Sequence, residues 1–554
     1  MKPQHITNKQ TAAQAIVNCM KIEKVRHVFC VPGESYLPIL DALYDSPTID
    51  VISARHEGGA AFMAEGYAKS TLKPGIVLAT RGVGAANLSI GVHTAYQDST
   101  PLIVFLGQVH RKFRGREAFQ EVDLEQFFQP ISKWVVEVKD PERMPEIVQK
   151  AFRIAQSGRP GPVIISIPED VLPIKAEMYF GPSVKKPNPV PAQAEVKAAE
   201  ELLLKAKHPL IIAGGGVKSA RAERALLTFA EKHKLPVMAA FRRHDVFPND
   251  HPLYVGHLGL GMAKEIRETV AQSDLIVACG TRLSEVTTQD YSIITAEKKL
   301  LQIDIDVATL GNVYAPDLGI VADLREALEA FTFNRGDRGW GDWVSKCRQR
   351  YEEASCLVYQ PTDVLNKQVI AILQDNLPAE ATITNDAGNF AGWLHTFFSF
   401  TKAHSYVGPT SGAMGYGMPA AIGAKLAFPH KTVVSLSGDG GFMMTAQELE
   451  TAVRYEIPII SLVFNNQMYG TIRMHQEMDY PNKVMATDLG NVSFVDLAKA
   501  LGADGHLVHT AEEFRQAFKW ALTMKRPVVI EIQTEQEHIA VGTTIDQLRK
   551  QKGE

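Results

Sequence analysis

The stretch TVVSLSGDGG, residues 432–441, decides how this chain folds, together with Asn465-Asn466 further on. An uninterrupted apolar run ends there in a glycine-rich turn, a helical pattern covers 446–455, and a second apolar run, 459–464, ends in the two asparagines. Such a βαβ unit places the ends of its two parallel strands side by side. Asp439 and Asn466 are therefore expected to meet at one edge of a parallel sheet.

The residue types at this edge suit a divalent cation beside a diphosphate. Magnesium prefers hard oxygen ligands in an octahedron completed by phosphate and water oxygens, and a carboxylate, an amide oxygen and a nearby main-chain carbonyl can supply the protein's share. Gly438, Gly440 and Gly441 let backbone N–H groups approach phosphates, and the following helix offers its positive end. For Gly-Asp-Gly alone, an ordinary α/β turn is the preferred alternative.

Working outward, similar apolar runs alternate with helical patterns along the whole chain. Runs buried on both faces with helices between them predict parallel sheets. We expect an α/β fold of three tandem doubly wound parallel-sheet domains, at 1–180, 190–335 and 360–540. The Pro- and Lys-rich stretch 181–191 is expected to link the first two.

Composition narrows the function classes. The chain has 554 residues and a formal net charge of −4. A weakly negative protein has no general electrostatic attraction for nucleic acid, while both enzymes and binding proteins remain possible. Apolar runs stop well short of the roughly 20 residues that a membrane span needs. The five cysteines are scattered without a C-x-x-C pair. We therefore expect a cytoplasmic protein with no membrane partner, no nucleic-acid partner and no disulfide framework.

In its motifs the chain resembles the thiamine-diphosphate-dependent enzymes, and among them the acetolactate synthase catalytic subunit. The resemblance rests on the Gly438-to-Asn466 pattern, on Gly412-Ala-Met-Gly-Tyr-Gly-Met-Pro-Ala-Ala421, and on Arg55-His-Glu57 with the motif at 63–68. It extends over nearly the whole length. It implies pyrimidine-binding, central and diphosphate-binding domains, with thiamine diphosphate and Mg²⁺ as cofactors. It also implies a homodimer or homotetramer with active sites between subunits.

The same resemblance assigns roles to single residues. Glu57 is the carboxylate that activates the cofactor through its pyrimidine ring. Asp439 and Asn466 are side-chain ligands of the magnesium ion, and Met468 is a ligand through its backbone oxygen. The carbonyl of Gly412 holds the cofactor's amino group, and Met414 supports its bent shape. The remaining expected cofactor contacts are Gly388, Asn389, Gly438, Gly440, Gly441, Tyr469 and Gly470.

On the substrate side, the resemblance places Gln120 opposite the reacting carbon, and Gln108 is a further candidate at a strand end. Gly33 lies in the loop near the thiazolium ring. The chain departs from the family pattern at Glu34 and Ser35, which form either part of the pocket or a solvated turn. Thr471 and His475 are expected to shape the acceptor pocket, and His475 stands where the synthases carry tryptophan.

Two further glutamates complete the comparison with the family. Glu169 replaces a family lysine, which bears on specificity. Glu65, to which no family role attaches, is expected to be a solvated helix residue.

The central domain carries a weaker nucleotide signal. Arg159, the turn Gly214-Gly215-Gly216 and Arg282 would permit FAD, although the family's flavin-holding segment is changed here, and ADP or an empty site stays open. An NAD-linked enzyme is set aside because the G-x-G-x-x-G fingerprint and a suitable acidic partner are lacking.

The resulting hypothesis is decarboxylation of a 2-oxo acid such as pyruvate, followed by carboligation to a second carbonyl compound, as in acetolactate synthase. The alternative within the superfamily is a non-ligating decarboxylase that releases an aldehyde. A non-catalytic relative of the same fold is a third possibility. Retention of Glu57, Gly412, Met414, Asp439 and Asn466 together argues against it.

Overall fold

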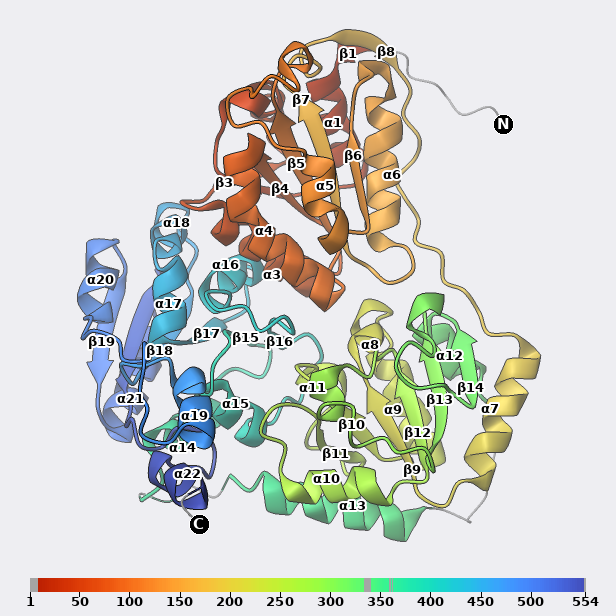
Figure 1. Cartoon of the computed structure of the whole chain (residues 1–554), viewed down its shortest axis with the longest axis vertical. Coiled ribbons are helices and arrows are strands. Elements are labelled where there is room, and N and C mark those ends of the chain that lie inside the picture. Colours follow the sequence, from red (N-terminus) through yellow and green to blue (C-terminus); the bar gives the residue numbers. More distant parts are fainter. Residues whose placement is uncertain (1–7, 333–339, 358–359, 361, 553–554) are drawn as a thin grey trace.

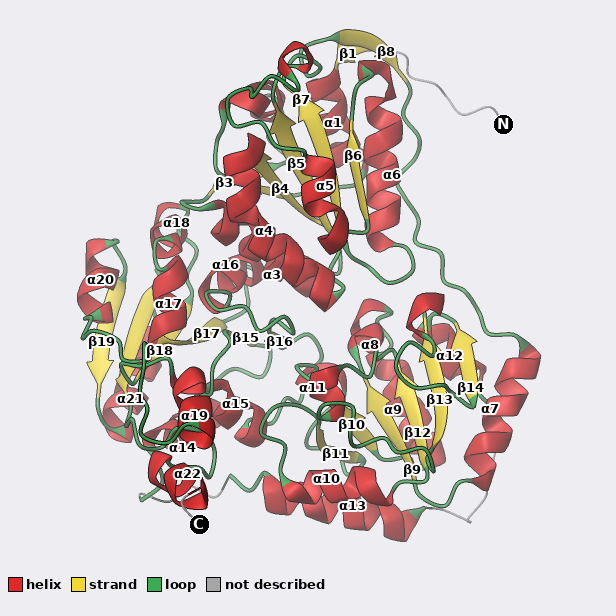
Figure 2. Cartoon of the chain, in the orientation of Figure 1, coloured by secondary structure: helices red, strands yellow, loops and turns green. Residues whose placement is uncertain are grey.

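The computed structural model describes residues 8–332, 340–357, 360 and 362–552. Within them, three parallel six-stranded sheets with interleaved helices follow one another along the chain (Figures 1 and 2). The expected α/β fold of three tandem parallel-sheet domains is confirmed. The expected domain limits at residue 1 and at 335 lie outside the described residues.

The first sheet has the strand order β3-β2-β4-β5-β7-β6. Its strands are β2 (His27–Cys30), β3 (Asp50–Ser53), β4 (Gly75–Thr80), β5 (Leu102–Gln108), β6 (Trp134–Glu137) and β7 (Pro162–Pro168). Its helices are α1 (Ala12–Ile22), α2 (Leu37–Tyr44), α3 (Glu57–Thr71), α4 (Arg81–Asp98), α5 (Leu124–Phe128) and α6 (Met144–Gln156). A separate antiparallel pair joins β1 (Asn8–Thr11) to β8 (Lys175–Met178).

Helices cover both faces of this sheet, as the side chains of β4 illustrate. Ile76 and Leu78 belong to one hydrophobic core, with α1, α2 and α6. Val77 and Ala79 belong to another, with α3 and α4. Successive residues of a strand point to opposite faces, so a strand buried on both faces has no polar alternation. This is why β4 and β5 are uninterrupted apolar runs.

The central sheet has the order β11-β10-β9-β12-β13-β14. Its strands are β9 (Pro209–Ala213), β10 (Val237–Ala239), β11 (Tyr254–His257), β12 (Leu275–Cys279), β13 (Lys299–Asp304) and β14 (Leu318–Val321). Its helices are α7 (Gln193–Lys205), α8 (Gly215–Ser219), α9 (Glu223–His233), α10 (Lys264–Gln272), α11 (Glu285–Thr288) and α12 (Leu324–Ala330). Helix α13 (Gly341–Ala354) follows and leads toward the third domain.

The third sheet has the order β16-β15-β17-β18-β20-β19. Its strands are β15 (Thr382–Asn385), β16 (Tyr406–Val407), β17 (Val433–Gly438), β18 (Ile460–Asn465), β19 (Asp504–Val508) and β20 (Val528–Gln533). Its helices are α14 (Leu365–Asn376), α15 (Ala391–Phe397), α16 (Gly417–Ala427), α17 (Asp439–Thr445), α18 (Glu448–Arg454), α19 (Gly470–Asp479), α20 (Phe494–Ala500), α21 (Ala511–Ala521) and α22 (Ile545–Lys552). The helix expected at 446–455 is α18, and the sequence analysis did not predict α17, which precedes it and begins at Asp439.

The first and third domains share one hydrophobic core, in which α3 crosses α16 (Figure 1). A Cβ at Gly423 would lie 2.0 Å from the carbonyl oxygen of Met63, and one at Gly66 would lie 2.6 Å from that of Ala420. Only glycine lets the two backbones approach this closely. The two glycine-containing motifs therefore have a packing role in addition to any role at the site. No described helix has the length and apolar character that crossing a membrane requires.

Candidate functional site

Asp439 and the turn after β18 meet at the end of neighbouring parallel strands, as expected. β17 pairs directly with β18, in the register Gly438 opposite Phe464. Asp439 is buried and accepts a hydrogen bond from the N–H of Gly440 at 2.9 Å. Burial raises the pKa of Asp439 to about 6, against the lowering effect of N–H groups that include those of Gln467 and Met468.

Asn466 lies within the same turn. Its side-chain oxygen accepts the N–H of Met468 at 3.3 Å, and Gly470 packs against its amide nitrogen. No group of three or more His, Cys, Asp or Glu side chains among the described residues could hold a metal ion. A cation here would therefore depend on Asp439, amide and carbonyl oxygens, and oxygens from outside the protein. That mixed oxygen set suits magnesium.

Close packing explains several of the glycines around this turn. A Cβ at Gly440 would lie 2.6 Å from the ring of Tyr469, and one at Gly441 would lie 2.6 Å from the carboxylate of Asp386. Gly388 has a φ of +148°. Gly438 ends β17 and precedes α17, whereas Gly470 begins α19 after Tyr469.

The sequence reasoning missed Asp386, which lies just before the predicted cofactor contacts Gly388 and Asn389. Its buried carboxylate accepts N–H groups from Ala387 at 2.8 Å, Gly415 at 2.9 Å and Tyr416 at 3.3 Å. Burial raises its pKa to about 7. Arg242, from the central domain, donates to the carbonyls of Asp386 and Pro409. Together they fix the loop in which Gly412 and Met414 lie.

The expected cofactor and pocket residues of the third domain lie around the same loops. Gly412 has a φ of +70° and open space where a Cβ would be, and Met414 is half-buried. Thr471 donates to the side-chain oxygen of Asn389 at 2.9 Å, so these two are in contact. His475 is exposed on α19.

In the first domain, Glu57 is the first residue of α3 and is buried. Asn87 of α4, which the sequence reasoning also missed, donates to its Oε2 at 2.9 Å. Gly84, one turn earlier on the same helix, lies beside Oε1. His56 caps α3 by accepting the N–H of Gly58. The carboxylate is thus held at a helix start, where negative charge is favoured.

The residues expected beside Glu57 are close to the end of β4. A Cβ at Gly33 would lie 2.5 Å from that of Thr80, and the hydroxyls of Ser35 and Thr80 are 2.7 Å apart. Glu34 is exposed. Ser35 is therefore a buried packing residue and no solvated turn, whereas Glu34 is free to face a ligand.

The two candidate glutamines differ in their surroundings. Gln108 is fully buried, its amide nitrogen donates to the carbonyl of Val122 at 2.9 Å, and its oxygen accepts the N–H of Val109 at 2.8 Å. Both polar atoms of the Gln108 amide are thus hydrogen-bonded to backbone groups. Gln120 has a φ of +64° and its carbonyl accepts the N–H of Gly82, which leaves its half-buried side chain near the start of α4.

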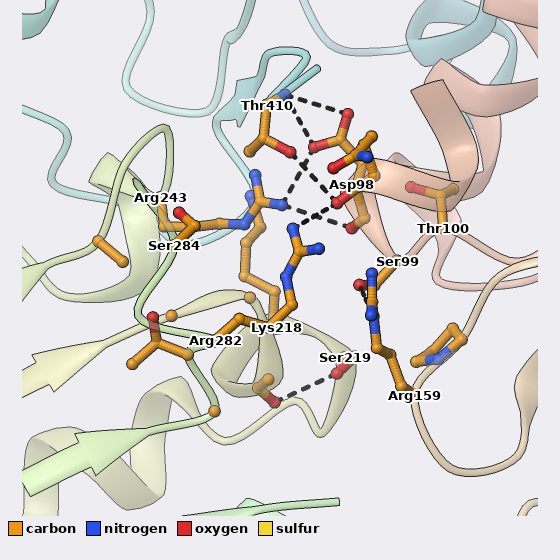
Figure 3. Close-up of a pocket in the computed structure, with 18 of the residues that line it drawn as sticks. Asp98, Ser99, Thr100, Arg159, Lys218, Ser219, Arg243, Arg282, Ser284 and Thr410 are labelled. Atoms are coloured by element: carbon orange, nitrogen blue, oxygen red, sulfur yellow. Dashed lines mark hydrogen bonds and ion pairs between the residues drawn. The ribbon is translucent and has the colours of Figure 1, made fainter. Parts of the chain in front are cut away.

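A cavity of about 570 Å³ lies between the three domains, where Arg243 and Arg282 of the central domain point toward the segment of Asp98 (Figure 3). Its cationic lining side chains are Lys69, Arg159, Lys186, Lys218, Arg243 and Arg282. Asp304 at the end of β13 also lines it.

The glycine turn of the central domain borders this cavity. Gly214 and Gly216 pack on Gly280, where a Cβ on either would lie within 2.6 Å of backbone. Arg159 donates to the hydroxyl of Ser99, and Arg282 donates to a carbonyl of the first domain. Gly214 and Gly216 are thus explained by strand packing, while Gly215 faces only the side chain of Arg243.

Glu65 is fully buried, so the expectation of a solvated helix residue is wrong. It pairs with Lys69 at 2.9 Å and accepts the hydroxyl of Tyr416, from the third domain. Lys69 also pairs with Asp98 at 3.0 Å, and Asp98 pairs with Arg243 of the central domain. We call Glu65, Lys69, Asp98, Arg243 and Tyr416 the three-domain junction.

Three family models match the chain. "Thiamine pyrophosphate enzyme, N-terminal TPP binding domain" matches residues 10–127, "Thiamine pyrophosphate enzyme, central domain" matches 196–331, and "Thiamine pyrophosphate enzyme, C-terminal TPP binding domain" matches 386–532. Each match falls on one of the three sheets.

The chain is also similar over most of its length to named proteins. The "Probable acetolactate synthase large subunit" of Methanocaldococcus jannaschii is 35% identical, over 94% of this chain and 91% of that protein. The acetolactate synthase isozyme 2 large subunit of Escherichia coli is 32% identical, over 94% and 95%. The acetolactate synthase large subunit of Lactococcus lactis is 32% identical, over 97% and 95%.

Proposed function

Since this chain belongs to the acetolactate synthase large-subunit family of thiamine pyrophosphate enzymes, we propose that it decarboxylates a 2-oxo acid such as pyruvate and joins the remaining acyl unit to a second carbonyl compound. The observation that carries the proposal is the buried carboxylate of Asp439 facing the turn of Asn466 and Met468. That arrangement is where a metal-bound diphosphate would be held.

In this proposal Mg²⁺ is held by the side chains of Asp439 and Asn466 and by the carbonyl of Met468. The backbone at Gly440 and Gly441, at the start of α17, would lie beside the diphosphate. When bound, thiamine diphosphate supplies the electron sink that makes loss of carbon dioxide possible. Support comes from the hard-oxygen character of these donors and from the glycine contacts, which leave no room for larger side chains.

Glu57 is proposed as the carboxylate that holds a hydrogen bond to the pyrimidine ring of the cofactor and shares the proton there. Asn87 fixes Oε2 from one side, which leaves Oε1 beside Gly84, where no side chain intervenes. Gln120 and Glu34 would then face the substrate, together with Thr471 and His475 from the third domain. Gln108 would support the backbone of this region, because both polar atoms of its amide are hydrogen-bonded to backbone groups.

We propose that the active unit is a homodimer, which in turn forms a homotetramer. Glu57 accepts a hydrogen bond from Asn87 of the first domain. The proposed diphosphate turn, which contains Asp439, belongs to the third domain. Apolar side chains stay exposed beside both patches in the single chain, Val83 and Ile90 on α4 and Met443 and Met444 on α17. A partner subunit that covered these side chains would bury apolar surface beside both patches.

For the central cavity we propose a nucleotide diphosphate, FAD or ADP. Its volume suits a small-molecule cofactor, and its cations outnumber its carboxylates. Arg159 and Arg282 are the residues that would hold the phosphates beside the turn at 214–216. Burial lowers the pKa of Arg282 to about 10, and nearby Arg159 and Arg243 add to this effect against the opposing charges of Asp98 and Asp304.

The experiment is product analysis with pyruvate after mass spectrometry of the released cofactors. With thiamine diphosphate and Mg²⁺, the protein should consume pyruvate and form acetolactate, or an acyloin when an aldehyde is added. Acetaldehyde as the sole product would contradict carboligation. Absence of any turnover across a 2-oxo acid panel, with thiamine diphosphate bound, would contradict the function as a whole.

A further inference from the structure

The segment that leads into Glu57 is held by a helix of the third domain. The N–H groups of Arg55 and His56 donate to the carboxylate of Glu448, the first residue of α18. The bond from His56 to Oε1 is 2.9 Å long and joins residues 392 positions apart in the sequence. The start of α3 therefore depends on a contact between two domains.

The side chain of Glu448 is fully buried, and both of its carboxylate oxygens accept hydrogen bonds. Oε1 accepts the N–H of His56, whereas Oε2 accepts the N–H of Arg55 at 3.1 Å and the hydroxyl of Thr451 at 2.8 Å. Acceptance at both oxygens suits an ionised carboxylate. A buried charge is costly unless it is hydrogen-bonded, so these contacts favour one defined position of the segment at 55–56.

The same carboxylate packs against the first turn of α3. A Cβ at Gly59 would lie 2.4 Å from Oε1 of Glu448, so only glycine allows this approach. Glu57, which begins α3, thus lies between two points that contact Glu448, namely the N–H of His56 before it and Gly59 after it. The backbone of Glu57 cannot shift without disturbing these contacts.

We infer that Glu448 is a positioning residue for the proposed reaction: it fixes the start of α3 and thereby where the Glu57 carboxylate lies relative to the pyrimidine ring of the cofactor. The inference rests on the proposed function, in which Glu57 shares a proton with that ring. Proton sharing needs hydrogen-bond geometry, and a misplacement of about 1 Å can lower a rate about a hundredfold. Glu448 has no exposed surface, so it acts through Glu57.

The test measures proton exchange at the reactive carbon of bound thiamine diphosphate, the carbon that must lose its proton before a 2-oxo acid can add. Exchange of this proton for deuterium is followed by NMR after acid quenching, with no substrate present. Glu448→Gln replaces one carboxylate oxygen by an NH₂ group, which cannot accept the hydrogen bond made there. The exchange rate should fall at least about tenfold. The affinity for thiamine diphosphate, measured by calorimetry, should stay near the wild-type value, because the proposed magnesium turn is unchanged.

Two variants on the same helix serve as controls. Glu450→Gln removes a carboxylate that contacts the same segment, but it does so through the guanidinium of Arg55, at 3.0 Å, and not through backbone N–H groups. Its exchange rate should stay near that of the wild type. Thr451→Val removes only the hydroxyl that holds Oε2 of Glu448, so its rate should fall by about threefold, less than in Glu448→Gln.

A wild-type exchange rate in Glu448→Gln would overturn the inference, as would an equal fall in Glu450→Gln, because a general loosening of α18 would then explain both. Loss of cofactor binding in a folded Glu448→Gln would also overturn it, since Glu448 would then support the third domain alone. If Glu448→Gln does not fold, Thr451→Val decides: a lowered exchange rate with normal cofactor affinity supports the inference, and a wild-type rate overturns it. A wild-type protein that exchanges this proton no faster than free thiamine diphosphate would instead remove the proposed function itself.

Discussion

Glu57 and Asn87 form a buried pair in which the amide donates to one carboxylate oxygen, while the other oxygen lies beside Gly84. Such a contact positions the carboxylate without adding charge. The proposed chemistry needs Glu57 to share a proton with the cofactor, whereas cofactor binding depends on the third domain. The two properties should therefore be separable by substitution.

In Glu57→Gln, which keeps the shape and the hydrogen bond to Asn87 but removes the shared proton, turnover of pyruvate should fall at least about a hundredfold. Thiamine diphosphate binding, measured by calorimetry, should remain near the wild-type value. Asn87→Ala serves as the control for position alone and should lose less activity. Normal turnover in Glu57→Gln would contradict the role.

Asp439→Asn removes the carboxylate that is proposed as a magnesium ligand but keeps the size of the side chain. The affinity for thiamine diphosphate in the presence of Mg²⁺ should fall at least about tenfold. Calorimetry with and without Mg²⁺ measures this affinity. Glu477→Gln, which removes a buried carboxylate elsewhere in the same domain, should leave the magnesium dependence unchanged. Equal cofactor affinity in Asp439→Asn and wild type would count against a metal ligand.

Local motifs were enough to predict the site residues that lie within single loops. They could not predict contacts between residues that are far apart in the sequence. The meeting of Asp439 with the turn at 466–468 follows from one βαβ unit, so its spacing is readable in the sequence. Asn87 and Glu57 come from different helices, and Asp386 acts through backbone N–H groups of a later loop. A buried Glu65 on a helix has no local signal, because its partner Tyr416 is far along the chain.

Among the secondary-structure elements, the central strands were predictable and the edge strands were not. β4, β5, β17 and β18 are buried on both faces and therefore apolar throughout. The edge strands β6 and β19 are partly exposed and mix polar and apolar residues, and β16 is only two residues long, so none of them gives a periodic signal. Helix α17 was missed because its glycines have low helix propensity.

The C-terminal helix α22 docks on α19 through one buried carboxylate. The carboxylate of Glu477 forms ion pairs with the guanidinium groups of Arg473 at 2.9 Å and Arg549 at 2.8 Å. The hydrogen bonds from Arg549 lower the pKa of Glu477 to about 2, helped by Arg473 and the N–H of Asn482 and opposed by burial. This contact holds α22 against α19, the helix that carries Thr471 and His475.

Glu477→Gln should lower the free energy of unfolding by about 3 kcal/mol at neutral pH, because two arginines lose their charged partner. The folded pKa lies below the ordinary value of about 4.3, so the carboxylate stabilises the protein above that value and its contribution is lost as pH falls toward 2. The melting temperatures of variant and wild type should therefore differ at pH 7 and converge in acid. A difference independent of pH would contradict the ion pair.

The three domains are joined by buried charges as well as by the shared core. In the junction, burial raises the pKa of Glu65, whereas Lys69 and Arg243 outweigh burial at Asp98 and hold its pKa at about 2. Lys69, Asp98 and Arg243 also line the central cavity. A ligand there would touch the residues that hold the third domain's loop through Tyr416.

Lys69→Met should destabilise the protein by about 3–5 kcal/mol, because it leaves two buried carboxylates with one cation fewer. The melting temperature should fall, and the fall should lessen in mild acid, where Glu65 with its raised pKa takes up a proton. Lys73→Met, just beyond the same helix and exposed, is the control and should change little. Similar melting temperatures for both variants would show that the junction contributes no stability.

Assembly gives the sharpest test of where the two halves of the site meet. Glu57→Gln and Asp439→Asn should each be nearly inactive. If Glu57 of one subunit serves the diphosphate turn of another, a mixed dimer of the two variants contains one site with both natural residues and one with neither. Random re-association should then restore about a quarter of wild-type activity, since half of the dimers are mixed and each has one intact site. If both residues of a site came from one chain, each chain would carry one defect and mixing would restore nothing.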